Sequence, residues 1–171
     1  LVRAAGHKVM TGFPGTPYIL HVLVENGYAE DARKMLMNEE CPSWLYEVKT
    51  GATTIWERWD ALKADGSVNL REYDKNVMIS FNHYAGGAVG DFLYRKVLGI
   101  SPLAAGYETF EVEPVPYEGI TSAEGFTETR YGRICVRWST VGKEIFVSVP
   151  VGTTCRVKFM GTDKIVGSGE Y

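Results

Sequence analysis

The amino-acid sequence predicts an α+β, multidomain chain in which a helical part, residues 1–105, precedes a small antiparallel β-sandwich, residues 106–171. Apolar residues recur mostly at helical spacing before about residue 106 and alternate with polar residues after it. Of the 171 residues, 45% are hydrophobic and 23% are charged, which is typical of a globular chain that can bury a core. A change from helical to strand periodicity in such a chain indicates separate helical and sheet layers.

Two helices joined by a short link are expected near the start of the chain. Thr16 followed by Pro17 favours a helix start, because Thr is a good N-cap and Pro suits the first helical position. Gly27 ends this run, and a second helix is expected over residues 28–38, which makes a helical hairpin. The side chains expected to point inward are Ile19, Leu20, Leu23, Val24, Ala32, Met35 and Leu36. Those expected to point outward are Glu30, Asp31, Arg33 and Lys34.

A third helix is predicted from residue 82 or 83 to Leu98, with Gly99 as its C-terminal stop. Glycines near its start weaken helix propensity but allow neighbouring backbone to approach closely; they are Gly86, Gly87 and Gly90. The long connection before this helix holds three of the four tryptophans. A connection of that length is usually either functional or disordered, and its three tryptophans argue against disorder.

Strands are predicted in the second part of the chain. The expected ranges are 109–113, 120–130, 133–139, 144–149 and 153–160. Ile134, Val136 and Trp138 alternate with their neighbours, so we expect Trp138 in the core. A disulfide between Cys135 and Cys155 stays open as an alternative to free, buried thiols, which we favour.

Charge and composition exclude several classes of function. A net charge of −3 argues against a nucleic-acid-binding surface, which needs clustered lysine and arginine. No apolar run approaches the roughly 20 residues that span a bilayer, so no membrane partner is expected. The three cysteines and three histidines lack the spacing of a metal site, and the sequence has no phosphate-binding glycine loop. We therefore predict no metal and no cofactor.

Residues 50–60 carry the most informative pattern in the chain, because Glu57 lies between Trp56 and Trp59. Aromatic rings stack on the C–H faces of sugar rings. A neighbouring carboxylate can orient a hydroxyl group or take a proton from the water that attacks a glycosidic carbon. The alternative is a buried loop in which the tryptophans fill the core and Glu57 pairs with Arg58 or with a helix end.

Four segments carry a resemblance to a known family. They are residues 11–18 (Thr-Gly-Phe-Pro-Gly-Thr-Pro-Tyr), 42–46 (Pro-Ser-Trp-Leu-Tyr), 51–60 (Gly-Ala-Thr-Thr-Ile-Trp-Glu-Arg-Trp-Asp) and 80–85 (Ser-Phe-Asn-His-Tyr-Ala). In this order they resemble the bacterial α-L-rhamnosidases, inverting glycosidases of glycoside hydrolase family seventy-eight. The resemblance implies that residues 1–105 are the C-terminal portion of an (α/α)6 barrel of six helical hairpins. It implies that residues 106–171 form the β-sandwich that follows the barrel.

The resemblance also implies site residues. Glu57 matches the family's general base, which takes a proton from water as that water attacks the anomeric carbon. His83 matches a residue that hydrogen-bonds rhamnose hydroxyls, since a neutral imidazole can both donate and accept. Trp56 and Trp59 are further candidates for substrate contact. The alternative is that His83 lies at a helix terminus, where its side chain forms hydrogen bonds with backbone groups of the helix end.

Two departures from the family pattern concern residues 63–76 and the general acid. Residues 63–76 look longer and more charged than the usual loop, and we interpret them as surface decoration, with a role at the rim beyond the rhamnose as the alternative. The family's general acid lies in an Asp-x-x-Arg-x-Glu motif that has no match here, and the pair Glu39-Glu40 is expected to be solvated. Because general acid catalysis is worth about 10²–10⁴-fold, we expect this chain alone to be inactive and its full-length parent to be the α-L-rhamnosidase.

The expected partners are rhamnose-containing glycosides or polysaccharides and the missing N-terminal part of the same chain, since Leu1 is not an initiator methionine. Apolar helix faces built for absent neighbours, Ile19/Leu23 and Met35/Leu36, also suggest a homodimer. Two alternatives stay open for the function: a non-catalytic carbohydrate-binding or scaffolding unit, and a related helical-barrel glycosidase for another sugar. The sequence leaves the aglycone, the linkage and the choice between bacterial cytoplasm and periplasm undecided.

Overall fold

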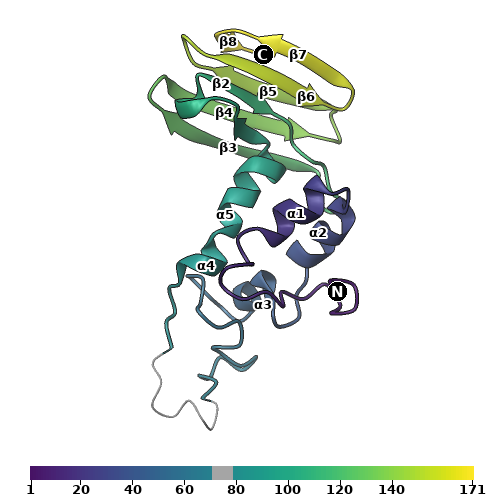
Figure 1. The fold of residues 1–171 in the computed structure, drawn as a ribbon, viewed down its shortest axis with the longest axis vertical. Helices are drawn as coiled ribbons and strands as arrows, with labels where there is room; N and C mark the ends of the chain where they lie inside the picture. Colours follow the sequence, from purple (N-terminus) through teal and green to yellow (C-terminus); the bar gives the residue numbers. More distant parts are fainter. Residues whose placement is uncertain (71–78) are drawn as a thin grey trace. The chain divides into compact units, whose positions relative to one another are not determined.

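The computed structural model describes residues 1–70 and 79–171, and its packing separates residues 1–89 from residues 90–171 (Figure 1). Each of these two units is described by itself. The boundary between residues 105 and 106 that the sequence pattern indicates stays a prediction. Within the described residues, no helix is long and apolar enough to cross a membrane.

The first unit is helical. Its elements are α1 (Ile19–Glu25), α2 (Ala29–Leu36), α3 (Trp44–Lys49), α4 (Tyr84–Gly87) and the first residue of α5 (Val89–Phe92). The helices α1 and α2 pack on each other, as the predicted hairpin requires. The buried side chains of α2 include Ala32, Met35 and Leu36, whose spacing of three and four residues places them on one face.

The predicted start of α1 at Thr16 is wrong, because the helix begins at Ile19 with Tyr18 as its N-cap. The Thr16 hydroxyl instead donates to the Gly12 carbonyl oxygen at 3.0 Å and lies 2.9 Å from the Thr11 hydroxyl. This side chain therefore stabilises the turn before the helix rather than the helix terminus.

The predicted outward position of Asp31 is also wrong, since this residue is only 6% exposed. Arg3 donates three hydrogen bonds to its carboxylate, the shortest at 2.8 Å, and the His7 Nε2 atom lies 2.9 Å from Oδ1. Hydrogen bonds from Arg3 and then His7 lower the pKa of the Asp31 carboxyl below its usual range. Asp31 thus ties the N-terminal residues to α2.

The apolar face proposed for self-association differs from the one that the structure presents. Met35 and Leu36 are buried inside the unit and are not available to a second copy. Ile19 and Leu23 are half-buried, while Tyr18, Val22 and Tyr28 are exposed. The homodimer itself stays a prediction.

The connection before the third predicted helix contains a short helix of its own, α3, which the sequence analysis missed. Ser43 is its N-cap, and the Ser43 side chain accepts a hydrogen bond from the Tyr46 N–H at 3.1 Å. The rest of this connection is irregular up to residue 70. Lys63 to Leu70 are mostly exposed. The remaining part of the predicted charged loop, residues 71–76, lies outside the described residues.

The third predicted helix is confirmed as a helical stretch made of α4, α5 and a π-helical segment, η2 (Leu93–Leu98). His83 is the N-cap of α4, and Gly99 is the C-cap of η2 in a left-handed conformation with φ 96°. The close neighbour at Gly86 is a side chain rather than the expected backbone: a Cβ atom there would lie 2.6 Å from a methyl group of Ile55 and 3.8 Å from the Trp56 carbonyl oxygen.

The second unit contains two four-stranded sheets, drawn in teal to yellow in Figure 1. The strands are β1 (Ile100–Pro102), β2 (Thr109–Val112), β3 (Ser122–Thr129), β4 (Gly132–Ser139), β5 (Glu144–Val149), β6 (Thr154–Phe159), β7 (Thr162–Val166) and β8 (Gly169–Glu170). The strand orders are β1-β2-β6-β7 and β3-β4-β5-β8. All pairs are antiparallel except β2 with β6, which is parallel, so the predicted sandwich is antiparallel-rich rather than strictly antiparallel.

The alternation predicted in β4 is confirmed, because Ile134, Val136 and Trp138 are all buried. The Trp138 Nε1–H group donates to the Val97 carbonyl oxygen at 2.9 Å, which satisfies the one polar atom of this side chain. Cys135 and Cys155 are free thiols, as favoured from the sequence, but only Cys155 is buried as expected, and burial raises the pKa of its thiol to about 12.

Candidate functional site

The segment that carries Glu57 is held against the segment that carries His83. The His83 N–H donates to the Ile55 carbonyl oxygen at 2.8 Å, and the Glu57 N–H donates to the Ser80 carbonyl oxygen at 3.0 Å. Two of the sequence motifs, residues 51–60 and 80–85, are therefore neighbours in the fold. The structure brings the main chains of both predicted site residues together.

The Glu57 side chain has a fixed partner in this arrangement. Its Oε2 atom accepts a hydrogen bond from the Ser80 N–H at 3.0 Å, so both the main chain and the carboxylate of Glu57 bind Ser80. Such a pair of bonds limits the rotation of the carboxylate. Glu57 is half-buried and lines a cavity, where a water molecule or a sugar hydroxyl can reach it.

This cavity has a volume of about 250 Å³. Its lining includes Thr11, Phe13, Trp56, Glu57, Trp59 and Gly86. Pockets for drug-sized ligands measure about 300–1,000 Å³, so this cavity suits a ligand of about one ring. A carboxylate between aromatic side chains in a cavity of this size fits a single sugar unit.

His83 combines the two roles that the sequence left open. Its Nδ1 atom accepts a hydrogen bond from the Ala85 N–H at 3.3 Å, which is the helix-terminal role. In the neutral ring this bond leaves the proton on Nε2, so His83 can donate from that atom to a hydroxyl oxygen. The ring is stacked on Phe13, with centroids 4.4 Å apart, and on Tyr84, with centroids 5.0 Å apart. Phe13 links His83 to the cavity, because Phe13 is part of its lining.

The two candidate tryptophans differ in exposure. Trp56 is only 4% exposed and meets Phe81 edge-on, with ring centroids 5.8 Å apart. Trp59 is half-buried and meets Trp44 edge-on, with centroids 5.4 Å apart. Trp44 in turn donates from Nε1 to the Gly86 carbonyl oxygen at 2.9 Å. Of the two, Trp59 offers the larger accessible surface to a ligand.

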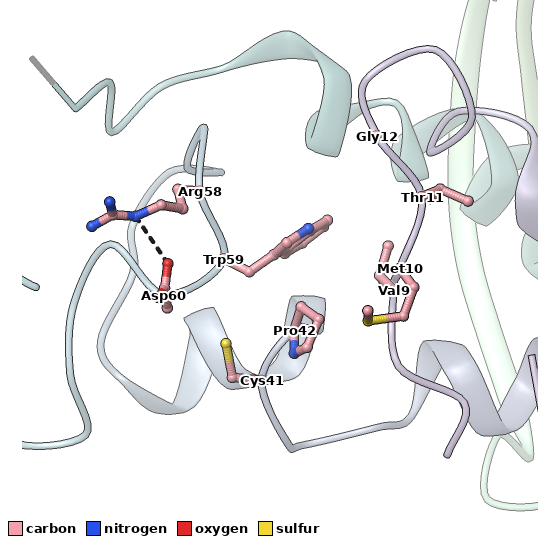
Figure 2. A pocket seen from close by; sticks show the side chains of 9 residues that line it. All are labelled: Val9, Met10, Thr11, Gly12, Cys41, Pro42, Arg58, Trp59 and Asp60. Carbon is pink, nitrogen blue, oxygen red and sulfur yellow. Dashed lines mark ion pairs between the residues drawn. The ribbon is translucent and has the colours of Figure 1, made fainter. Parts of the chain in front are cut away.

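A second cavity of about 460 Å³ shares part of its lining with the first (Figure 2). It shares Thr11, Gly12, Arg58 and Trp59 with the first cavity. Figure 2 shows an ion pair between Arg58 and Asp60 in its lining, with Nε and Oδ1 2.9 Å apart. The two cavities thus meet at Trp59.

A third carboxylate group near the site was missed by the sequence analysis. Glu47, on α3, is fully buried, and its Oε2 atom accepts a hydrogen bond from the Trp56 N–H at 3.2 Å. Burial raises the pKa of Glu47 to about 7, although the bond from Trp56 works in the opposite direction. Ser80 and Phe13 were also missed as neighbours of the site residues, although both lie within the quoted motifs. Among residues 1–70 and 79–171, no group of three or more His, Cys, Asp or Glu side chains is arranged to hold a metal ion.

Comparison with known proteins identifies the class. Residues 1–97 match the family described as the bacterial alpha-L-rhamnosidase 6 hairpin glycosidase domain, and residues 99–170 match the bacterial alpha-L-rhamnosidase C-terminal domain. The first match places the helical unit among the six-hairpin glycosidases. The chain belongs to the bacterial α-L-rhamnosidase family.

Individual relatives agree with this assignment. The chain is 39% identical over 160 residues to an alpha-L-rhamnosidase of Formosa agariphila and 38% identical over 159 residues to one of Streptomyces avermitilis, with 92% of the chain covered in each case. The solved structure of the Aspergillus terreus enzyme matches 99% of the chain with a TM-score of 0.89 and 34% identity. The Streptomyces avermitilis enzyme complexed with L-rhamnose matches 99% with a TM-score of 0.86 and 32% identity.

The chain covers only a small part of each relative. It spans 17% of the Formosa protein and 15% of the Streptomyces protein, and it covers 20% and 18% of the two solved chains. The helical unit described here thus matches part of a six-hairpin domain.

Proposed function

We propose that this chain supplies the general base and one wall of the sugar site in an inverting α-L-rhamnosidase, within a longer polypeptide. The observation that carries the proposal is the position of Glu57 in a cavity of about 250 Å³, beside Trp59 and bonded to the segment of His83. The family membership and the relative complexed with L-rhamnose support rhamnose as the sugar.

In this mechanism Glu57 accepts a proton from a water molecule while the water oxygen attacks the anomeric carbon. The bond between that carbon and the leaving oxygen breaks on the opposite face, and a carboxylic acid there gives its proton to the leaving oxygen. We assign this acid to a part of the polypeptide outside the chain. The two carboxyl groups of inverting enzymes stand about 6.5–9.5 Å apart, which leaves room for the water.

The other residues of the site bind and orient the sugar. His83 donates from Nε2 to a rhamnose hydroxyl, since its Nδ1 atom is engaged by the Ala85 N–H. Trp59 provides an aromatic face for the C–H groups of the ring, and Trp56 supports the loop from inside. Ser80 holds the Glu57 carboxylate toward the cavity.

The test is hydrolysis of an aryl α-L-rhamnoside by the longer polypeptide, with wild type and Glu57→Gln compared. We expect turnover to fall by about 10²–10⁴-fold while L-rhamnose still binds, because the amide keeps the size of the carboxylate but cannot take the proton. Glu144→Gln, at an exposed position in the second unit, is the control and should keep wild-type turnover. NMR of the first product should show the inverted anomer.

Each competing function predicts another outcome. A non-catalytic carbohydrate-binding unit would give a longer polypeptide that binds rhamnose without turnover in the wild type. A glycosidase for another sugar would hydrolyse a different aryl glycoside and ignore the rhamnoside. Turnover by the 171-residue chain alone would contradict the assignment of the general acid to another part of the polypeptide.

A further inference from the structure

Glu47 is a buried carboxyl group that the proposed mechanism does not use. It lies on α3, its residue exposure is 0%, and its Oε2 atom accepts the Trp56 N–H at 3.2 Å. Its Oε1 atom has no hydrogen-bond partner within the described residues. A buried carboxyl group with a single bond contributes little to stability, since its desolvation is costly. The conformation that Glu47 imposes on its neighbours is therefore a better explanation of this residue than stability.

The direction of the Trp56 N–H explains why a side chain is needed at this position. Around Glu57, the Ile55 carbonyl accepts a hydrogen bond from the His83 N–H and the Glu57 N–H donates to the Ser80 carbonyl. The Trp56 N–H lies between these two contacts in the sequence and donates to Glu47 instead of to the 80–83 segment. A buried N–H group must find an acceptor, and Glu47 is that acceptor.

We propose that Glu47 is a positioning residue, which fixes the main chain at Trp56 and thereby sets the direction of the Glu57 carboxylate. This inference rests on the proposed role of Glu57 as general base. The segment is held from both sides: by Glu47 at Trp56, and by the 80–83 segment at its two neighbours. The main chain of Glu47 adds a further tie, because its carbonyl oxygen accepts the Ala52 N–H at 2.9 Å at the start of the same loop.

These contacts lie entirely within the first unit. Glu47 is fully buried by residues of this chain, so the bond to Trp56 does not depend on other parts of a longer polypeptide. Both the ionised and the protonated carboxyl group keep an oxygen that can accept the Trp56 N–H. A glutamine keeps such an oxygen as well, whereas a methionine of similar size does not.

The experiment compares Glu47→Met, Glu47→Gln and Glu57→Gln in the longer polypeptide, with kcat and KM for an aryl α-L-rhamnoside as readouts. We expect Glu47→Met to lower kcat by roughly 10–100-fold with KM within about twofold, since a base displaced by about 1 Å can cost 10²-fold. Glu47→Gln should restore most of the kcat that Glu47→Met loses. Leu36→Met, a buried change on α2, is the packing control and should leave the ratio of kcat to KM near wild type.

The variants also distinguish a failure of the positioning role of Glu47 from a failure of the proposed function of Glu57. Wild-type kcat in Glu47→Met, or an equal loss in Glu47→Gln and Glu47→Met, would overturn the positioning role. If Glu47→Met does not fold, Glu47→Asp decides: its shorter side chain withdraws the acceptor, and wild-type kcat in that variant would also overturn it. Wild-type turnover in Glu57→Gln would instead refute the proposed function, independently of Glu47.

Discussion

Replacing Glu47 with glutamine should change how the stability of the protein depends on pH. The Glu47 pKa rises from 4.5, the value expected in the unfolded chain, to about 7 in the folded protein, because burial disfavours the charged form. The folded state therefore holds a proton that the unfolded state releases between these two values. At about 1.4 kcal/mol for each tenfold change in proton affinity, this difference amounts to about 3 kcal/mol.

The sign follows from the direction of the pKa change. Below pH 4.5 the carboxyl group is protonated in both states, so its full contribution to the free energy of unfolding is present. As the pH rises toward 7, the unfolded state ionises first, and the wild type loses about 3 kcal/mol of that contribution. An amide does not titrate, so Glu47→Gln should lack this loss.

The assay is chemical unfolding, followed by tryptophan fluorescence, at a series of pH values for wild type and Glu47→Gln. The free energy of unfolding of the variant, relative to that of the wild type, should rise by about 3 kcal/mol between about pH 4.5 and pH 8. Exposed Glu144→Gln should show no comparable gain. Near pH 6, where carboxyl groups of ordinary pKa are ionised, the infrared carbonyl band of a protonated carboxylic acid should be stronger in the wild type than in Glu47→Gln, and this difference reports the same proton directly. A difference between the two proteins that stays constant across this pH range would refute the reasoning.

Three further changes test the packing. Gly86→Ala should destabilise the protein by about 1–3 kcal/mol in chemical unfolding, because its Cβ would meet an isoleucine methyl group at 2.6 Å, whereas Gly87→Ala, in open space, should not. Trp138→Phe should lower the free energy of unfolding by about 1–3 kcal/mol, because the buried Val97 carbonyl loses its hydrogen-bond donor. The smaller side chain also leaves a cavity, which adds to this loss, and an unchanged unfolding midpoint would contradict the prediction. Cys155 should react with a thiol reagent only after unfolding, while the two half-exposed cysteines react in the folded protein; native labelling at Cys155, seen by peptide mass mapping, would show otherwise.

The parts of the fold that follow from periodicity were predictable. The apolar face of α2 and the alternation in β4 are patterns within one element, and both are confirmed. The strands β1, β7 and β8 were missed for local reasons: β1 has three residues and ends in proline, β7 is exposed at four of five positions, and β8 has two residues. Short or exposed strands carry too little alternation to be recognised.

The errors concern side chains whose partners lie far away in the sequence. Asp31 looks like a solvent-facing residue of α2, because helical period alone does not reveal Arg3, which is 28 positions away. Thr16 has the composition of an N-cap, but nearby carbonyl groups of its own turn compete for the hydroxyl.

The same distinction applies to the site. The motif around Glu57 and the motif around His83 were recognised from the sequence, and the structure adds that their main chains are hydrogen-bonded to each other. The roles of both residues stay predictions. Glu47 could not be recognised, since its partner is a backbone N–H group, which leaves no trace in residue types.

The most direct test of the central claim is the rescue of Glu57→Ala by azide in the longer polypeptide. Azide is already an anion and attacks the anomeric carbon without giving up a proton, so it does not need a general base. If Glu57 is the base, Glu57→Ala should lose turnover by about 10²–10⁴-fold, and azide should restore much of it while forming a rhamnosyl azide of inverted configuration. Near wild-type turnover without azide, or a slow variant that azide does not accelerate, would contradict the assignment of Glu57 as the general base.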